Sequence, residues 1–231
     1  MILKRDINMI GQKNVALNYD QAIEKGSDKS YPSLELVRLD NIFLKAKRGS
    51  KVLEIGVGSG CNTLYLTKKG YNVTGIDIAK SSKVITEKKL LKNRINKKNF
   101  RIKILKYNYK KLPLKSNYFD CVICMSVLSL LGSKKKIEKL LSELQRVMKP
   151  KGKIILDIND ANSEFSGKNK KIKKDTYIFK GGLEEFTCYC PKKLSTFENI
   201  VKDFFKIKDK GYSGFKLFKR RINEWIICAE K

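Results

Sequence analysis

The 231-residue sequence contains no histidine, and its apolar stretches are short. Without histidine, the chain lacks the side chain that most often acts as a base near neutral pH and that most often binds zinc. Its longest apolar stretches, such as Cys121 to Leu131, are interrupted and too short to span a bilayer. The first residues, MILKRD, lack the apolar region of a secretory signal. We therefore expect a cytoplasmic protein with no membrane segment.

Cysteines are few, and their spacing gives little support to a metal site. Cys121 and Cys124 lie in a predicted strand, where residues three apart point to opposite faces. Cys188 and Cys190 could share a face, but tetrahedral zinc would need two more ligands. The cysteines that could complete such a four-cysteine site are Cys61 and Cys228. We favour reduced thiols and predict no bound metal.

Acidic residues are outnumbered by basic ones, 23 to 51, which gives a formal net charge of +28. Such an excess suggests a nucleic-acid partner. The excess is nearly all lysine and is spread along the chain, whereas arginine, which reads guanine and grips phosphate with two parallel bonds, is sparse. Compositional drift together with solubility explains the charge as well as RNA binding does. The charge alone therefore leaves both interpretations open.

Strand and helix signals alternate from residue 51 onward, which is typical of a parallel sheet with crossover helices. The predicted strands are Lys51–Ile55, Asn72–Ile76, Phe100–Leu105, Phe119–Met125 and Lys153–Ile158. The predicted helices are Asn62–Lys69, Lys80–Asn93 and Lys134–Met148, the last ended by Pro150. We expect one domain over residues 46–231, preceded by an N-terminal helical cap over residues 1–45 that includes a helix near Ser33–Leu44.

An insertion is expected at about residues 160–192. Its lysine-rich part, Ser163–Lys174, has no apolar period and is interpreted as a mobile excursion. Thr176–Phe179 and Phe186–Tyr189 flank Gly181-Gly182 and predict a hairpin. After the insertion we expect one helix and two strands. These are Lys193–Lys202, Phe204–Lys210 and Asn223–Ala229.

Three glycines at alternate positions, Gly56, Gly58 and Gly60, follow the first predicted strand. Glycine permits both a tight strand-to-helix turn and the close approach of a ligand to the backbone. A dinucleotide fingerprint would place its third glycine at the position of Cys61. Glu54 just before the turn would be unfavourable beside a pyrophosphate but favourable beside an ammonium group. The pattern therefore suits S-adenosylmethionine, which carries an ammonium and a sulfonium and no phosphate.

Asp77 ends the next predicted strand and supplies the second half of this pattern. Its carboxylate could accept hydrogen bonds from both ribose hydroxyls, as the acidic residue of a Rossmann unit does. Ile78 could pack on the adenine. A plainer role for Asp77, as the cap of the following helix, stays open.

Five segments together resemble the successive motifs of class I S-adenosylmethionine-dependent methyltransferases. They are Val52–Gly60, Val73–Ile78, Leu112–Leu114, Tyr118–Asp120 and Lys149–Lys153. The resemblance covers roughly residues 30 to 160 and keeps the family's order and spacing. It implies an α/β fold with a Rossmann-like seven-stranded mixed sheet, its last strand antiparallel, and helices on both faces.

The resemblance also implies which residues contact the cofactor. Beyond the turn residues and Asp77, Asn108 takes a position where the family often has an adenine-binding aspartate, and Tyr109 follows it. An asparagine oxygen can still accept a hydrogen bond from the exocyclic amine. Met125, followed by Ser126, would border the methyl donor.

The sequence is least informative about the methyl acceptor. The residues after the fourth strand lack the Asn/Asp-Pro-Pro-Tyr/Phe signature of amino-group methylation on nucleobases and glutamine. We predict transfer to a small metabolite or sugar-type acceptor, with an RNA methyltransferase or a non-enzymatic nucleic-acid-binding protein as alternatives. A dinucleotide oxidoreductase is disfavoured by Cys61. No catalytic base is identified, although Glu184 and Glu185 are candidates, and the oligomeric state is open.

Overall fold

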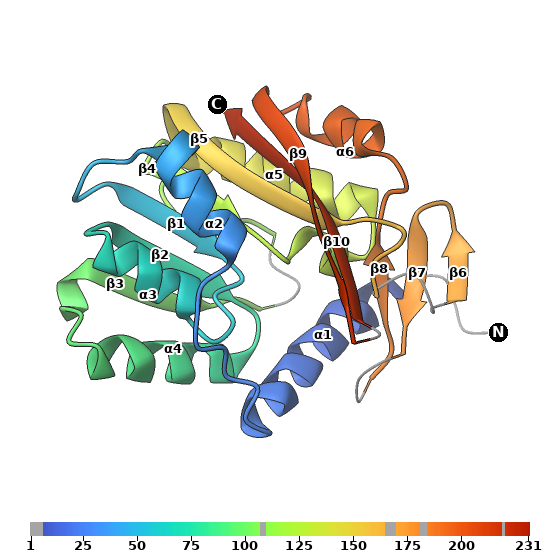
Figure 1. Cartoon of the computed structure of the whole chain (residues 1–231), viewed down its shortest axis with the longest axis horizontal. Helices are drawn as coiled ribbons and strands as arrows, with labels where there is room; N and C mark the ends of the chain where they lie inside the picture. Colours follow the sequence, from blue (N-terminus) through green and yellow to red (C-terminus); the bar gives the residue numbers. More distant parts are fainter. Residues whose placement is uncertain (1–6, 107–109, 165–169, 181–183, 219) are drawn as a thin grey trace.

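Seven strands form the central sheet of the computed structural model, which describes residues 7–106, 110–164, 170–180, 184–218 and 220–231 (Figure 1). The strand order is β3-β2-β1-β4-β5-β10-β9, and β10 runs antiparallel to both of its neighbours. The strands are β1 (Lys51–Ile55), β2 (Asn72–Asp77), β3 (Phe100–Ile104), β4 (Phe119–Cys124), β5 (Met148–Asn159), β9 (Lys206–Leu217) and β10 (Arg220–Glu230). The predicted seven-stranded mixed sheet is confirmed.

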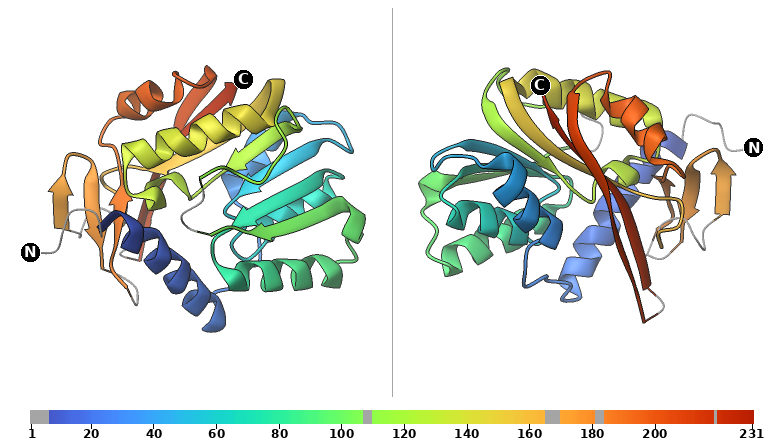
Figure 2. Two further views of the ribbon diagram at one scale, coloured as in Figure 1. Left: turned by 180° about the vertical axis from the view of Figure 1, so that it is seen from behind. Right: turned by 45° about the horizontal axis from the view of Figure 1, so that its top comes forward.

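Helices cover both faces of this sheet, as predicted (Figure 2). They are α1 (Ile7–Glu24), α2 (Leu34–Leu39), α3 (Cys61–Lys68), α4 (Lys80–Lys92), α5 (Lys134–Val147) and α6 (Leu194–Val201), with short helical turns at Asp40–Leu44, Lys97–Asn99 and Leu128–Leu131. On one face, Leu36 of α2 and Leu66 of α3 pack in a cluster with Val52 of β1. On the other, Leu141 of α5 and Phe197 of α6 belong to a larger core.

The two-residue period of the strands decides which side chains face which layer. In β4, Cys121 packs in the cluster under α2 and α3, whereas Cys124 packs in the core under α5 and α6. The prediction that these two cysteines point to opposite faces is therefore confirmed. All six cysteine side chains are buried, and none forms a disulfide. In the described part of the chain, no group of three or more acidic or cysteine side chains has the geometry to hold a metal ion.

The insertion forms a small antiparallel sheet of its own, in the order β6-β7-β8. Its strands are β6 (Lys170–Lys173), β7 (Thr176–Phe179) and β8 (Phe186–Tyr189). The pairing of Thr176 with Tyr189 and of Phe179 with Phe186 confirms the predicted hairpin. Within Ser163–Lys174, the segment interpreted as a mobile excursion, Lys170–Lys173 forms β6, whose exposed residues pair along β7 as an edge strand.

The last two strands are longer than predicted. β9 continues to Leu217 and β10 begins at Arg220, so that residues 211–217 pair with residues 220–226 in a hairpin that extends past the sheet. Most side chains of the added β9 segment are exposed, and the segment contains Gly211 and Gly214. Because most of these side chains are exposed, the alternation that marks a half-buried strand is weak there.

The N-terminal helix α1 runs between α4 and the small sheet (Figures 1 and 2). At its middle, Val15 packs in an apolar cluster with Phe186 and Cys188 of β8. The boundary between an N-terminal cap of residues 1–45 and the rest of the chain stays a prediction. None of the helices in the described residues combines the length and apolar content that a membrane span requires.

Candidate active site

The turn between β1 and α3 is built from left-handed glycines. β1 ends at Ile55, and α3 begins at Cys61. Gly56, Gly58 and Gly60 have φ values of +79°, +51° and +80°. Residues other than glycine rarely adopt such φ values without strain. This explains why so short a turn contains three glycines.

The three glycines differ in what surrounds them. A Cβ added to Gly56 would lie 2.3 Å from Cγ2 of Val127, and one added to Gly60 would lie 2.7 Å from the side chain of Thr86. A Cβ at Gly58 would meet nothing within 4 Å. Gly56 and Gly60 are therefore needed for packing, whereas the backbone at Gly58 faces open space that a ligand could enter.

Glu54 lies at the carboxyl end of β1, directly before this turn, and is 1% exposed. The hydroxyl group of Thr63 donates a hydrogen bond to its Oε2 at 2.5 Å. Its other oxygen, Oε1, is buried without a hydrogen-bond partner among the described residues. Burial raises the pKa of Glu54 to about 8, and the neighbouring Asp77 carboxylate adds to the rise. A buried acid with an unpaired oxygen is a suitable partner for a cationic ligand group.

Asp77 ends β2 and accepts three hydrogen bonds from main-chain N–H groups. Its Oδ2 accepts from Gly58 at 2.9 Å, and its Oδ1 accepts from Ile78 at 2.7 Å and Ala79 at 2.9 Å. Two of these bonds fix the residues just before α4, but the N-cap of α4 is Ala79, so the plainer role of Asp77 as the helix cap is not what the structure shows. A carboxylate has about four acceptor positions, so capacity for a further donor remains. Ile78 is half-buried and packs against the apolar cluster around Val15.

The end of β4 also lies against the glycine turn, through the contact of Val127 with Gly56. Met125 is buried in the cluster under α2 and α3. Ser126 has a left-handed φ of +57°, and its main-chain N–H donates to Oδ1 of Asp157 at 2.6 Å. The structure therefore brings together Glu54, the glycines, Asp77 and Met125. The predicted adenine contacts Asn108 and Tyr109 lie outside the described residues.

Two acidic residues at this edge of the sheet were not predicted. Asp157 on β5 is 1% exposed, and Glu224 on the neighbouring β10 is half-buried. The sequence does mark Asp157 as unusual, because it is the one charged residue within the otherwise apolar segment Ile154–Ile158. Glu224 carries no comparable signal, since it lies between Asn223 and Trp225 in a strand with a polar start.

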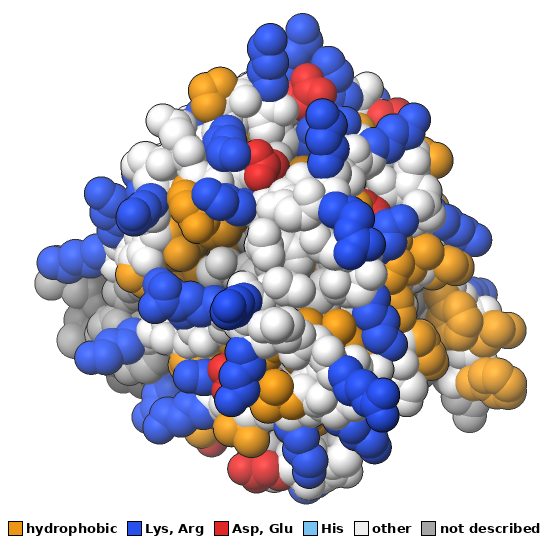
Figure 3. Space-filling model, turned by 90° about the vertical axis from the view of Figure 1, so that its left-hand side faces the viewer, with side chains coloured by type: hydrophobic (Ala, Val, Ile, Leu, Met, Phe, Trp, Pro, Cys, Tyr) orange, Lys and Arg blue, Asp and Glu red, His pale blue; other side chains and the backbone are white. Residues whose placement is uncertain are grey.

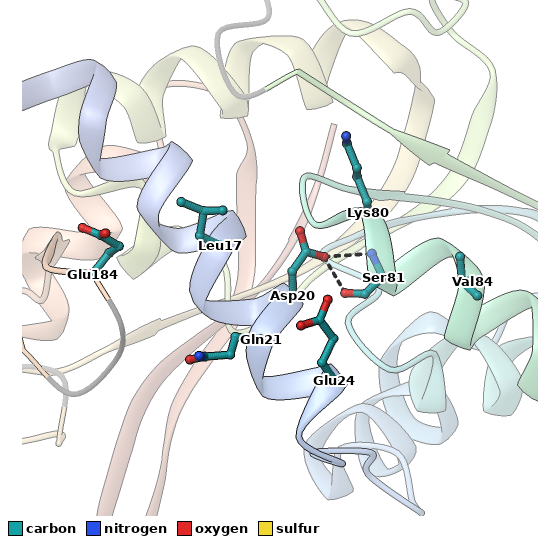
Figure 4. Close-up of a pocket in the computed structure, with 8 residues that line it drawn as sticks. All are labelled: Leu17, Asp20, Gln21, Glu24, Lys80, Ser81, Val84 and Glu184. Carbon is teal, nitrogen blue, oxygen red and sulfur yellow. Dashed lines mark hydrogen bonds between the residues drawn. The ribbon is translucent and has the colours of Figure 1, made fainter.

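Helix α1 spans this edge and is attached near its carboxyl end and at its middle. Near its carboxyl end, Oδ1 of Asp20 accepts hydrogen bonds from the main-chain N–H of Ser81 at 2.8 Å and from its hydroxyl at 2.5 Å (Figure 4). Further back, the side-chain amides of Asn14 and Asn18 donate to main-chain carbonyls of the insertion, each at 2.8 Å. Burial of its hydroxyl group and the nearby Asp77 carboxylate raise the pKa of Tyr19 to about 12.

A surface hollow of about 530 Å³ lies where α1 meets α4, lined by Asp20, Lys80, Ser81 and Glu184 among others (Figure 4). The side chains of Glu184 and Glu185 are exposed, and Oε1 of Glu185 lies 3.0 Å from Nζ of Lys180. These exposed positions give no support to Glu184 or Glu185 as the base.

Comparison with known proteins agrees with this geometry. The family described as "Methyltransferase domain" matches residues 53–156. An uncharacterized methyltransferase of Alkaliphilus oremlandii is 26% identical over 188 residues, which are 81% of this chain and 79% of that protein. A methyltransferase structure from Methanosarcina mazei has a TM-score of 0.70 at 22% identity, with 83% and 96% of the two chains covered. The 1,6-didemethyltoxoflavin N1-methyltransferase of Burkholderia thailandensis, solved with its acceptor and S-adenosylhomocysteine, has a TM-score of 0.69 at 13% identity, covering 100% and 91%.

Proposed function

Since the chain belongs to the class I S-adenosylmethionine-dependent methyltransferases, we propose that it transfers the methyl group to a small-molecule acceptor, a metabolite or a sugar-type compound. The observation that carries most weight is the unpaired Oε1 of buried Glu54 beside the open backbone of Gly58. A cationic, phosphate-free nucleoside would satisfy that oxygen, whereas the pyrophosphate of a dinucleotide would be repelled by it.

Each part of the cofactor site is assigned a role in this proposal. Glu54 pairs with the ammonium of S-adenosylmethionine, and Gly56, Gly58 and Gly60 line its methionine and ribose. The ribose and adenine are assigned to a second group of residues. Asp77 binds the ribose hydroxyls, and Ile78 packs on one face of the adenine. Asn108, followed by Tyr109, contacts the edge of the adenine ring. When bound, S-adenosylmethionine supplies a methyl group on a sulfonium.

The protein's own contribution is positioning and the exclusion of water. Met125 borders the methyl group at the end of β4, and α1 covers the site from the side of α4. The left-handed Ser126, fixed by Asp157, sets the path of the chain next to the methyl group. Six buried cysteines without disulfides fit the reducing cytoplasm, which we propose as the compartment.

An RNA acceptor is the second candidate, because the net charge is +28. Figure 3 shows lysine and arginine side chains spread over one face with apolar and other side chains between them, rather than gathered in one block. A groove that follows an RNA backbone would require a continuous basic surface. On the face shown, no such continuous basic surface is present, and this favours the small-molecule acceptor.

Two measurements test this function. Calorimetry with S-adenosylmethionine and with NAD should show binding of the first only, and the absence of S-adenosylmethionine binding would remove the proposal. Incubation with methyl-labelled cofactor and fractionated cell extract should place the label in the low-molecular-weight fraction. Label that enters RNA and disappears with ribonuclease would establish the second candidate instead.

A further inference from the structure

Three carboxylates lie together on the sheet face that carries Glu54, beyond the end of β4. Asp157 comes from β5, Glu224 from the adjacent β10, and Glu35 from the first turn of α2. In the antiparallel register, Asp157 lies opposite Ile226, and Glu224 lies opposite Asn159. Asp157 and Glu224 are therefore diagonal neighbours on the same face of the sheet, offset by two residues. A buried group of acidic residues stands out in a chain whose net charge is +28.

Asp157 has one oxygen that the described part of the protein does not satisfy. Its Oδ1 accepts from the N–H of Ser126 at 2.6 Å, while its Oδ2 is buried with no hydrogen-bond partner. Glu35, in contrast, accepts through both oxygens, from the hydroxyls of Ser213 at 2.7 Å and Ser33 at 2.8 Å. A buried acceptor without a hydrogen-bond donor destabilises the folded state, and a ligand that donates to it would remove that cost.

The position of this group matches the acceptor side of the site. The glycine turn and Asp77 occupy the ends of β1 and β2, so the cofactor assigned to them lies on that half of the sheet. Methyl transfer is an in-line displacement, and it requires the acceptor on the far side of the methyl group from sulfur. Val127 contacts the glycine turn and Ser126 contacts Asp157, so the edge continues from the cofactor half directly to the carboxylates.

We propose that Asp157 and Glu224 bind the methyl acceptor, and that the acceptor presents an amine nitrogen to them. The inference rests on the proposed function and narrows its acceptor class. A protonated amine carries a positive charge and several N–H donors, so it can satisfy Asp157 and Glu224 together. A hydroxyl group has a single donor, and an acceptor with a phosphate or carboxylate at this point would be repelled.

The charges around Asp157 and Glu224 favour a state in which the two carboxylates hold a proton until a cationic ligand replaces it. Burial and then the carboxylate of Glu35 raise the pKa of Glu224 to about 7, and burial and then Glu224 raise the pKa of Asp157 well above its usual range. Although burial opposes it, hydrogen bonding from Ser213 and Ser33 keeps the pKa of Glu35 below its usual value. The charge of Lys29 acts on both carboxylates and lowers the pKa of each. The pair therefore retains a proton near neutral pH, which an arriving ammonium group displaces.

The same pair can take the proton that the acceptor must lose. A protonated nitrogen has no lone pair, so one N–H proton passes to the ionised carboxylate before transfer. The freed lone pair forms the N–C bond, while the S–C bond breaks and its electron pair stays on sulfur. The products are the methylated ammonium ion, which keeps the remaining positive charge, and the neutral thioether S-adenosylhomocysteine, with the first proton on the carboxylate.

Binding without turnover gives the first test. With S-adenosylhomocysteine bound, we would measure Tm at pH 8 in the presence of ethylamine, benzylamine or tryptamine, each compared with its alcohol isostere. At least one amine should raise Tm more than its alcohol does in the wild type. The difference should disappear in Asp157→Asn and Glu224→Gln and persist in Asp203→Asn, an exposed control that removes the same charge. If no amine exceeds its alcohol, the proposal is overturned.

The chemical class of the product gives the second test. One portion of a metabolite extract is acetylated, and its O-acetyl esters are then cleaved with hydroxylamine, so that only the amines of the extract stay blocked. The enzyme and methyl-labelled cofactor are incubated with this portion and with an untreated portion. Acetylation should abolish labelling, and the label should be found on nitrogen. Label on oxygen or carbon, or labelling that survives acetylation, would refute the amine class while leaving the methyltransferase function intact. Failure to bind S-adenosylhomocysteine would instead indicate that the proposed function itself is wrong.

Asp157→Asn separates ligand binding from a purely structural role. The asparagine oxygen can still accept from Ser126, so the turn after β4 is kept while the charge is lost. On the acceptor identified above, we expect KM to rise at least tenfold with S-adenosylmethionine affinity within twofold of wild type. A structural role alone would change the affinity for S-adenosylmethionine and leave the preference for amines over alcohols unchanged.

Discussion

The carboxylate of Asp77 accepts a hydrogen bond from the main-chain N–H of Gly58, nineteen residues earlier, with 2.9 Å between Oδ2 and N. This contact ties the end of β2 to the one glycine of the turn that faces open space. The same side chain holds the start of α4 through Ile78 and Ala79. One residue therefore shapes the turn and faces the ligand assigned to it.

We expect Asp77→Asn to weaken S-adenosylmethionine binding by about 10- to 100-fold, because a charged acceptor with several positions becomes a neutral one with a single oxygen. The free energy of unfolding should fall by about 1–2 kcal/mol, since one of the three N–H donors loses its partner. Calorimetry and urea unfolding measure the two effects. Unchanged affinity with reduced stability would show that Asp77 acts only on the turn.

Alanine at Gly60 should reduce stability more than alanine at Gly58 does. At Gly60 the new Cβ would lie 2.9 Å from the backbone Cα of Thr86, so α4 must shift, and we expect a loss of about 2–4 kcal/mol in the free energy of unfolding. At Gly58 no atom lies within 4 Å, and the cost should be about 1 kcal/mol from the φ of +51° alone.

The same pair of variants separates packing from ligand approach. Gly58→Ala should bind S-adenosylmethionine at least tenfold more weakly, because the added methyl group occupies the space assigned to the ligand. Calorimetry at a temperature where both variants are folded makes the comparison. Wild-type affinity in Gly58→Ala would mean that the ligand does not approach this backbone.

Replacing Glu54 with glutamine should make the ligand-free protein more stable above neutral pH. The pKa of Glu54 is raised from its usual 4.5 to about 8, so the folded state binds more protons than the unfolded state between these values. Stability from this residue is therefore present below about pH 4.5 and is lost as pH rises to about 8. Glu54→Gln should exceed wild type by about 2–4 kcal/mol at pH 8.5 and by nothing at pH 4.

Urea unfolding of both proteins from pH 4 to 8.5 measures this difference directly. In the same variant, binding of S-adenosylmethionine should weaken, since the ammonium loses its charged partner. A variant that is less stable than wild type across the whole range would contradict the burial of an unpaired carboxylate at this position.

Asp20 attaches α1 to α4 through two hydrogen bonds to Ser81, at the start of α4 where helix N–H groups lack partners. Asp20→Ala should lower the local opening free energy of α1 by about 1–2 kcal/mol and speed hydrogen exchange over Ile7–Glu24. Glu24→Gln is a matched control on the same helix, with an exposed side chain beside the same hollow. Equal exchange in all three proteins would show that α1 is held by its other contacts.

The sequence was sufficient to place β1, the glycine turn and α3 to within one residue. There the local rules agree, because a buried apolar strand, three glycines and an amphipathic helix each favour the same structure. It was insufficient for β9 and β10, whose outer residues have no core to face and are held by pairing with each other. A hairpin whose side chains are mostly exposed on both faces leaves little periodic apolar signal in either strand.

The acidic side of the site could not be read in the same way. Asp157 is recognisable as an odd residue in an apolar strand, but its environment comes from Ser126, Glu35 and Glu224, which are far apart in the chain. Burial of a carboxylate depends on which strands become neighbours, and only the order β4-β5-β10 sets that. The cofactor half of the site is local in sequence, whereas the half assigned to the acceptor is assembled by topology.

The burial of every cysteine provides this protein with built-in labels for its own unfolding. Burial raises the pKa of Cys121 and of Cys228 to about 11, and it is the thiolate that reacts with alkylating reagents. Native molecules should therefore stay unmodified, while a molecule that opens exposes thiols from α3, β4, β8 and β10 at once. The time course of alkylation, read by mass, would report the lifetime of the folded state without any engineered probe.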